Sequence, residues 1–358
     1  MSDIGNSLNT TNPARWFGRF SNGPVWNEYT CYYNNYTLIN YAIEDSVTNH
    51  TIFNVFGNVP QKSPSIVDQI QNFTTTFKNA FNNRSIENDI AVIQLSLNDL
   101  SLYASLVKSN GLQDTNFVKK LVTSIYNSVN TLNSFGYKKI IVTDIPEIKY
   151  LPFKDMVDPQ MVKIIQEMTP KINRLIFQTI VSYARSNRKD LDWIKTVSID
   201  TMFQLSKKSS VTDALGITYS NIPCNNVSPT NVLISTCTDP DQYFFNDATS
   251  LSTKVHALIG AVFSQVINNT SFSYDPISII SLIPRFNITG AGSFNNFLYF
   301  ANTSQTGMVN VSEYNFNSTL DSASNISNQK NSASISSLIF SNTFVYFTAF
   351  LSITVLLL

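Results

Sequence analysis

Few side chains in this chain could act as a general base near neutral pH, because it contains only two histidines, His50 and His256. His50 lies in the tripeptide Asn-His-Thr, which predicts a surface loop. His256 lies in a predicted helix over residues 250–267, where it is expected to be a helix-packing or surface histidine rather than a substitute base. The aspartates of the stretch TDPDQY predict a turn rather than a metal site, and no metal is expected.

Three polar stretches carry hydroxyl and carboxylate groups, and two of them also carry an amide; these are the types used for nucleophilic attack and oxyanion stabilisation. The stretch MSDIGNS at residues 1–7 predicts a tight loop of the kind that follows a buried strand. SLNDL at residues 96–100 directly follows an apolar run, and DATS at residues 247–250 begins the last predicted helix. Whether the side chains of these three stretches can act together depends on the strands and helices that position them.

Strands and helices are predicted to alternate along the chain. Short runs rich in Ile and Val predict strands over residues 89–95, 138–145 and 193–200. Apolar residues at helical spacing predict helices over residues 116–135, 158–188 and 250–267. Gly136 would end the first helix, and Pro170 would divide or kink the second. This alternation predicts a parallel sheet with helices on both faces and a ligand site beyond the carboxyl ends of the strands.

Four stretches in order resemble the GDSL, or SGNH, family of ester hydrolases, and most of all its microbial lipase and acylhydrolase branch. They are MSDIGN, RWFGRFSNGPVWNEY, SLNDL and CTDPDQYFFNDATSLSTKVHALIG. GRFSNGPVW and DPDQYFFND are specific, whereas SLNDL alone is weak. The resemblance covers residues 1–267. It implies a three-layer, flavodoxin-like α/β fold, ester-bond hydrolysis, an acyl-ester or lipid substrate, and no cofactor.

The resemblance also implies roles for single residues. Asn98 falls on the asparagine that stabilises the oxyanion, and Asp247 on the aspartate that orients the catalytic histidine. Ser250 replaces that histidine, and a hydroxyl has no pKa suited to a general base. Glu44 and Asp45, in NYAIEDS, replace two glycines of another family motif, where carboxylates would oppose a developing oxyanion.

The first family motif is only partly matched. Ser2, Asp3, Gly5 and Asn6 align with the second half of Gly-Asp-Ser-x-Ser-Asp-x-Gly-Asn. The family's nucleophilic serine would then lie just upstream of Met1, together with an interior strand of the sheet. Loss of an interior strand would leave backbone groups unpaired on both sides of a gap. We therefore expect the natural chain to extend upstream of Met1.

These differences predict an ester-hydrolase fold that has lost its activity. Two alternatives stay open. The first is an active, surface-anchored lipase or esterase whose serine lies upstream and whose base is another group. The second is a glycosylated cell-surface protein with a binding or structural role.

The composition favours the secretory pathway. The chain has 24 basic and 24 acidic residues and no basic run, which argues against binding to nucleic acid. Cys224 and Cys237 could form a disulfide, with Cys31 left over. Sequons, which are candidate sites for N-glycans, are dense. They begin at Asn9, Asn35, Asn49, Asn72, Asn83, Asn226, Asn268, Asn269, Asn287, Asn302, Asn310, Asn317 and Asn325.

The C-terminal region is expected to lie outside a domain of residues 1–270. Residues 271–337 are rich in Ser and Asn and predict a glycosylated stalk. Residues 338–358 carry no charge and are long enough to cross a bilayer. Asn331 is a candidate attachment site for a GPI anchor, followed by a polar spacer and an apolar tail that is removed. A retained transmembrane helix is the alternative, and either one predicts the extracellular side of a membrane.

Overall fold

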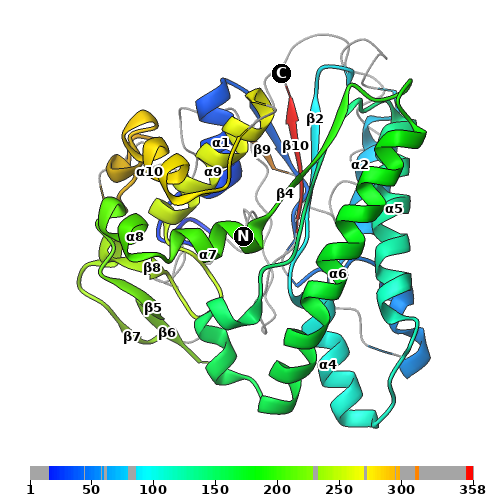
Figure 1. Ribbon diagram of the computed structural model, residues 1–358, viewed down its shortest axis with the longest axis horizontal. Coiled ribbons are helices and arrows are strands. Elements are labelled where there is room, and N and C mark those ends of the chain that lie inside the picture. Colours follow the sequence, from blue (N-terminus) through cyan, green and yellow to red (C-terminus); the bar gives the residue numbers. More distant parts are fainter. Residues whose placement is uncertain are drawn as a thin grey trace.

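The computed structural model describes residues 16–43, 45–57, 59, 63–79, 86–228, 233–269, 272–294, 296–298, 311–313 and 352–357. These residues form an α/β fold with helices on both faces of a mostly parallel sheet, which confirms the α/β part of the predicted fold class (Figure 1). Within the described part of the chain, no helix combines the length and the apolar character needed to cross a membrane.

The central sheet has the strand order β4-β3-β2-β10-β1-β9. Its strands are β1 (Thr37–Asn40), β2 (Ile90–Gln94), β3 (Lys139–Thr143), β4 (Trp193–Val197), β9 (Val311–Glu313) and β10 (Ser352–Leu357). The pairs β2–β3, β3–β4 and β1–β9 are parallel. β10 runs antiparallel to both of its neighbours, β1 and β2. All five residues of β2 are buried, as expected for a central strand covered on both faces.

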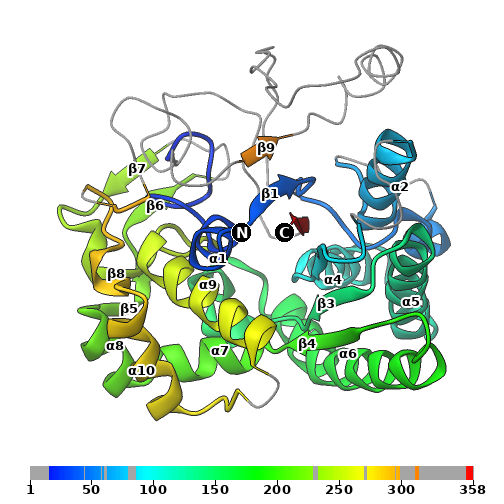
Figure 2. The same cartoon turned by 90° about the horizontal axis from the view of Figure 1, so that it is seen from above.

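Helices cover the two faces of this sheet (Figure 2). One face is covered by α2 (Ile66–Phe77), α4 (Asn98–Asn110), α5 (Phe117–Phe135) and α6 (Pro159–Ser186). The other is covered by α1 (Trp26–Asn34), α7 (Ile199–Ser206) and α9 (Thr253–Asn268), with α8 (Ser209–Leu215) and α10 (Pro276–Arg285) further out. Short 3-10 helices are η1 (His50–Phe56), η2 (Ile148–Tyr150), η3 (Pro152–Met156), η4 (Pro240–Gln242) and η5 (Ile288–Gly290).

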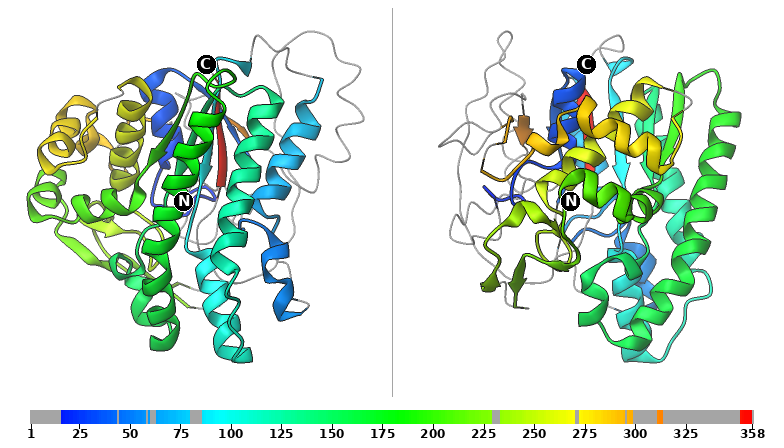
Figure 3. Two further views of the ribbon diagram at one scale, coloured as in Figure 1. Left: turned by 45° about the vertical axis from the view of Figure 1, so that its right-hand side comes forward. Right: turned by 60° about the vertical axis from the view of Figure 1, so that its left-hand side comes forward.

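Two small sheets flank the helices on the side of α8 (Figure 3). β5 (Tyr219–Pro223) pairs with β8 (Tyr243–Phe245), and β6 (Asn225–Val227) pairs with β7 (Leu233–Thr236). A disulfide joins Cys224 to Cys237, which links the start of the β6–β7 hairpin to its end. Cys31 is free and buried.

Most predicted elements are confirmed, with two corrections. α5 ends at Gly136, whose φ of +126° favours glycine. β4 stops at Val197, before the predicted end at residue 200, because Ser198 caps α7 and accepts a hydrogen bond from the Thr201 N–H. α6 is continuous through Pro170, so the expected division is wrong. Pro170 is exposed, and water can therefore satisfy the carbonyl that its missing N–H leaves free.

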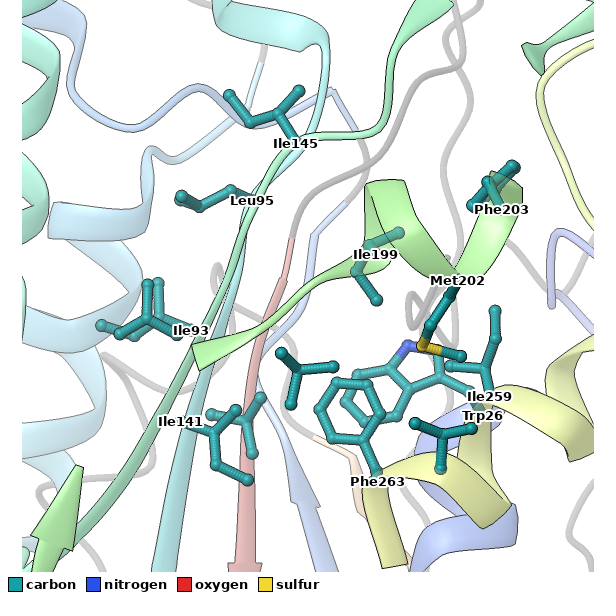
Figure 4. Packing of buried hydrophobic residues seen from close by; sticks show 14 of the residues in the cluster. Trp26, Ile93, Leu95, Ile141, Ile145, Ile199, Met202, Phe203, Ile259 and Phe263 are labelled. Atoms are coloured by element: carbon teal, nitrogen blue, oxygen red, sulfur yellow. The ribbon is translucent and has the colours of Figure 1, made fainter. Parts of the chain in front are cut away.

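α1 and α9 pack closely over the sheet. Gly260 allows this approach, because a Cβ there would lie 2.6 Å from the Tyr29 Cβ. The rings of Trp26 and Phe263 stack with centroids 4.2 Å apart. Figure 4 shows these two rings beside Met202 of α7 and the buried strands. The core of the domain therefore lies between the sheet and these helices, as well as on the opposite face.

The predicted domain boundary at residue 270 is too early. α10 begins at residue 276, and Asp275 caps it by accepting a hydrogen bond from the Ser278 N–H. Its residues Ile279, Leu282 and Ile283 are buried against the domain. In this segment the helical spacing of apolar residues therefore predicts the structure better than the Ser-rich composition does. Six residues of the predicted anchor form β10, and residues 338–351 lie outside the described residues. The choice between a GPI signal and a transmembrane helix stays a prediction.

Candidate functional site

Several predicted site residues fall outside the described part of the chain. They are Ser2, Asp3, Gly5, Asn6, Glu44 and Asn331. Asn98, Asp45, Asp247, Ser250 and both histidines are described, and the site is built from them.

Asn98 lies at the carboxyl end of β2, where a ligand site is expected, and begins α4. Its Nδ2 donates a hydrogen bond of 2.9 Å to the carbonyl of Ser46, in the loop that follows β1. Its backbone N–H donates to the Ser96 hydroxyl at 3.1 Å. The side chain is 8% exposed. The structure therefore joins the SLNDL and NYAIEDS loops, as expected for neighbouring parts of one site.

Asp45 takes a backbone conformation that favours glycine. Its φ is +60°, in the left-handed region that glycine enters without steric cost. Aspartate is among the few other residues that tolerate this region. The turn therefore keeps the geometry of a glycine turn but carries a carboxylate.

Asp99 ties the same two loops together from inside the protein. Both of its carboxylate oxygens lie 3.0 Å from the Thr48 backbone nitrogen, and Oδ2 also accepts a 2.8 Å hydrogen bond from the Thr48 hydroxyl. Burial raises the pKa of Asp99 to about 6, although the bonds from Thr48 act in the opposite direction. Asp99 therefore holds the loops in place, and the sequence alone did not predict this role.

The Asp247 carboxylate is used within its own turn, between β8 and α9. Oδ1 accepts hydrogen bonds from the Ser250 N–H at 2.7 Å, the Thr249 N–H at 2.9 Å and the Thr249 hydroxyl at 3.0 Å. The Ser250 carbonyl accepts in return from the Asn246 N–H at 2.8 Å. Both Asp247 and Ser250 are buried. Asp247 thus orients a backbone turn, and no imidazole stands at position 250 for it to orient.

His256 is fully buried in α9, as its predicted packing role requires. Its Nδ1 accepts a 3.2 Å hydrogen bond from the Trp26 backbone N–H, near the start of α1. Burial lowers the pKa of His256 far below its ordinary value, so the ring is neutral. Its Nε2 has no hydrogen-bond partner among the described residues. The ring therefore joins two helices and does not contact Asp247.

His50 begins η1, which follows the loop that bonds to Asn98 and Asp99. Its Nε2 is 2.8 Å from the Ser63 carbonyl and 3.8 Å from Asp68 Oδ2. The His50 side chain is 16% exposed, which is less exposure than the predicted surface loop would give it. η1 packs against α4 and α5, on the face of the sheet opposite to α9.

A buried ion pair lies inside the GRFSNGPVW stretch, and sequence reasoning missed it. Arg19 donates to Glu28 through Nε at 3.0 Å and through a terminal nitrogen at 2.6 Å, and both side chains are almost fully buried. Glu28 also accepts from the Val25 N–H at 2.9 Å, at the start of α1. The guanidinium lies 4.9 Å from the Trp16 ring centroid. The pair fixes the entry of the chain into α1.

A second polar cluster lies at the carboxyl ends of β3 and β4. Asp144 accepts a 2.6 Å hydrogen bond from the Ser198 hydroxyl and a 3.0 Å bond from the Asp200 N–H. Burial raises the pKa of Asp144 to about 7. Because its partners belong to the first turn of α7, Asp144 anchors that helix to β3.

Metal binding has no geometric basis in the described part of the chain, where no three His, Cys, Asp or Glu side chains lie close enough to share an ion. In TDPDQY, Asp239 accepts hydrogen bonds from the Asp241 N–H and the Gln242 side chain, which forms the predicted turn.

Comparison with models of known protein families and with curated proteins finds no match for this chain. Its function must therefore be argued from its own residues.

Proposed function

We propose that this chain is a non-catalytic relative of the GDSL-type ester hydrolases, with the flavodoxin-like fold of that family. The motif resemblance and the mostly parallel sheet support the family. The observation that carries the loss of activity is the turn at Asp247, where the carboxylate binds the backbone of Ser250 instead of an imidazole.

Among the described residues, the turn at Asp247 offers no imidazole that could accept the proton of a serine nucleophile. A serine nucleophile needs a neighbouring group that accepts its proton near pH 7, and the Ser250 hydroxyl cannot do so. His256 is enclosed in the core and its Nδ1 is occupied by Trp26, so it does not reach a substrate. His50 Nε2 lies 2.8 Å from the Ser63 carbonyl, so this ring is engaged with the chain that leads into α2. Asn98 falls on the oxyanion asparagine of the resemblance, but its Nδ2 already donates to the Ser46 carbonyl, and an amide donor does not remove a proton.

An ester-hydrolysis assay on the full chain tests this proposal. We expect acetate and butyrate esters of p-nitrophenol to be hydrolysed at the rate of the buffer, and no labelling by a fluorophosphonate. The variants Asn98→Ala and Asp247→Asn should then behave like the parent, as should the exposed control Asp213→Asn. Saturable turnover that falls in the first two variants but not in the control would establish the alternative, an active esterase.

We further propose that the protein acts at the cell surface as a glycoprotein. The Cys224–Cys237 disulfide suits an oxidising compartment. Several sequon asparagines are exposed, which glycan transfer requires; they include Asn35, Asn226 and Asn287. Retention of the protein in the membrane fraction of a secreting host, on the outer side, tests this location. Uniform recovery from the cytosol would refute it.

A further inference from the structure

β4 is the last strand at one end of the central sheet, and its outer side has no partner among the described strands (Figure 2). On its inner side β4 pairs in parallel with β3, and the Trp193 N–H donates to the Lys138 carbonyl at 3.2 Å. Successive residues of a parallel strand bond to opposite sides, so the backbone groups of Ile194 and Thr196 face outward. This edge therefore offers backbone donors and acceptors to an added strand.

A groove of about 280 Å³ lies along this open edge, between β4 and α6. Ile194 and Thr196, whose backbone groups face outward, also line it with their side chains. α6 contributes apolar side chains, and the Phe177 ring is 56% exposed. The other apolar residues that line the groove from this helix are Ile180, Val181 and Ala184. An extended peptide could thus bond to β4 through its backbone and place alternate side chains in the groove.

Two guanidinium groups give the groove a positive end. Arg185 lies in the last turn of α6, and Arg188 follows in the connection that leads into β4, so both are near the start of that strand. Neither arginine forms an ion pair with another described residue. Asp190 and Asp192, in the same connection, are exposed and are not among the described residues that line the groove. A negative charge is therefore favoured at one end of the ligand rather than along it.

The groove lies in a part of the chain that carries no candidate glycan site. No sequon begins within residues 84–225, a range that contains α4, α5, α6 and the strands β2, β3 and β4. Sequons are dense on either side of this range. In a secreted protein, α6 and β4 would therefore carry no glycan of their own that could cover the groove.

We propose that this groove binds the C-terminal segment of a partner protein, which adds to β4 as an antiparallel strand and places its free carboxylate on Arg185 and Arg188. An antiparallel strand ends where β4 begins, so its carboxylate reaches the two guanidiniums. A parallel strand would instead bring an amino group to this positive end. The inference goes beyond the proposed function and holds whether or not the domain hydrolyses esters.

Fluorescence anisotropy of the full chain with a labelled hexapeptide of alternating threonine and valine tests this recognition. The peptide with a free C-terminal carboxylate should bind saturably, and its C-terminal amide about tenfold more weakly, because the amide lacks the charge that bonds to the guanidiniums. Laurate carries the same charge on an apolar chain without peptide groups. Equal binding of acid and amide, no saturation at about 1 mM peptide, or tighter binding of laurate than of the peptide would each overturn the proposal.

Variants of the positive end locate the carboxylate. Arg185→Gln and Arg188→Gln should each weaken binding of the free acid by about fivefold and leave binding of the amide unchanged. Lys171→Gln removes a positive charge from an exposed position of the same helix outside the groove, and this control should change neither affinity. Arginine variants that bind the free acid as tightly as the parent does would refute the assigned end.

Hydrogen exchange gives a readout that does not depend on any variant. The free-acid peptide should slow exchange of the Ile194 and Thr196 amides, because these N–H groups gain partners on the outer side of β4. Exchange of the Trp193 amide should stay the same, because its N–H already bonds to the Lys138 carbonyl. Saturable binding that leaves Ile194 and Thr196 unprotected would show that the peptide does not add to β4.

Discussion

The buried carboxyl of Asp99 makes the stability of the domain depend on pH. Its pKa rises from 3.8 to about 6 on folding, mainly because burial disfavours the charged form. The folded protein therefore keeps a proton that the unfolded chain releases between about pH 4 and pH 6. Stability from this group is complete below about pH 4 and is lost as the pH rises through about 6. A shift of roughly two pKa units corresponds to about 3 kcal/mol.

The variant Asp99→Asn isolates this contribution, because asparagine resembles the protonated acid. Its Oδ1 can accept from the Thr48 N–H, and its Nδ2 can donate to the Thr48 hydroxyl, so both contacts survive. We expect the variant to gain about 3 kcal/mol relative to the parent between pH 4 and pH 7. This is a large part of the roughly 5–15 kcal/mol that stabilises a typical domain.

Urea denaturation at intervals from pH 4 to pH 8 measures this difference. The exposed Asp213→Asn, in α8, is the matched control and should follow the pH dependence of the parent. Asp144 and Asp200 also have raised pKa values and add to the slope of the parent, but they remain in both proteins and cancel in the comparison. A difference between Asp99→Asn and the parent that stays constant with pH would refute the assignment.

Three further predictions concern packing and modification. Glu28→Gln removes the charge of the carboxylate that pairs with the buried Arg19 guanidinium and should cost about 3–5 kcal/mol in denaturant unfolding; a loss near zero would contradict the role of the pair. Gly260→Ala places a Cβ 2.6 Å from the Tyr29 Cβ and should cost about 1–3 kcal/mol in thermal unfolding, despite the higher helix propensity of alanine. In a secreting host, mass spectrometry should find the buried Asn72 unmodified, and glycosylation there would refute this fold around α2. The exposed sequons that should carry glycans are Asn35, Asn226 and Asn287.

Elements with strong local signals could be predicted from the sequence. α5 repeats apolar residues at helical spacing and ends at a glycine, and β2 and β3 are short runs of β-branched residues. The end of β4 was missed because the Ser198 cap decides it, and the following apolar residues fit a strand or a helix equally well. Apolar composition therefore identifies buried segments more reliably than it fixes their boundaries.

Contacts between distant segments could not be predicted in this way. The partners of Asp99 and His256 lie 51 and 230 residues away, and no local pattern identifies either partner. The C-terminal run of residues 338–358 shows the same limit, because its local sequence allows two different environments. An uncharged run is compatible with a bilayer or with a buried strand, and only its pairing with β1 and β2 places part of it in the sheet.

The stretch that most resembles the family is also one that holds the fold together. In GRFSNGPVW, Arg19 pairs with Glu28, Gly23 leaves room for Thr253, and Trp26 binds His256 through its backbone and Gln94 through its ring. These contacts join α1 to α9 and to β2, and none of them needs a substrate. Ser250, by contrast, takes part in the turn at Asp247 through its backbone N–H and carbonyl. The contacts of residues 18–26 therefore explain how α1 is held against α9 and β2, and this explanation requires neither a substrate nor a catalytic role.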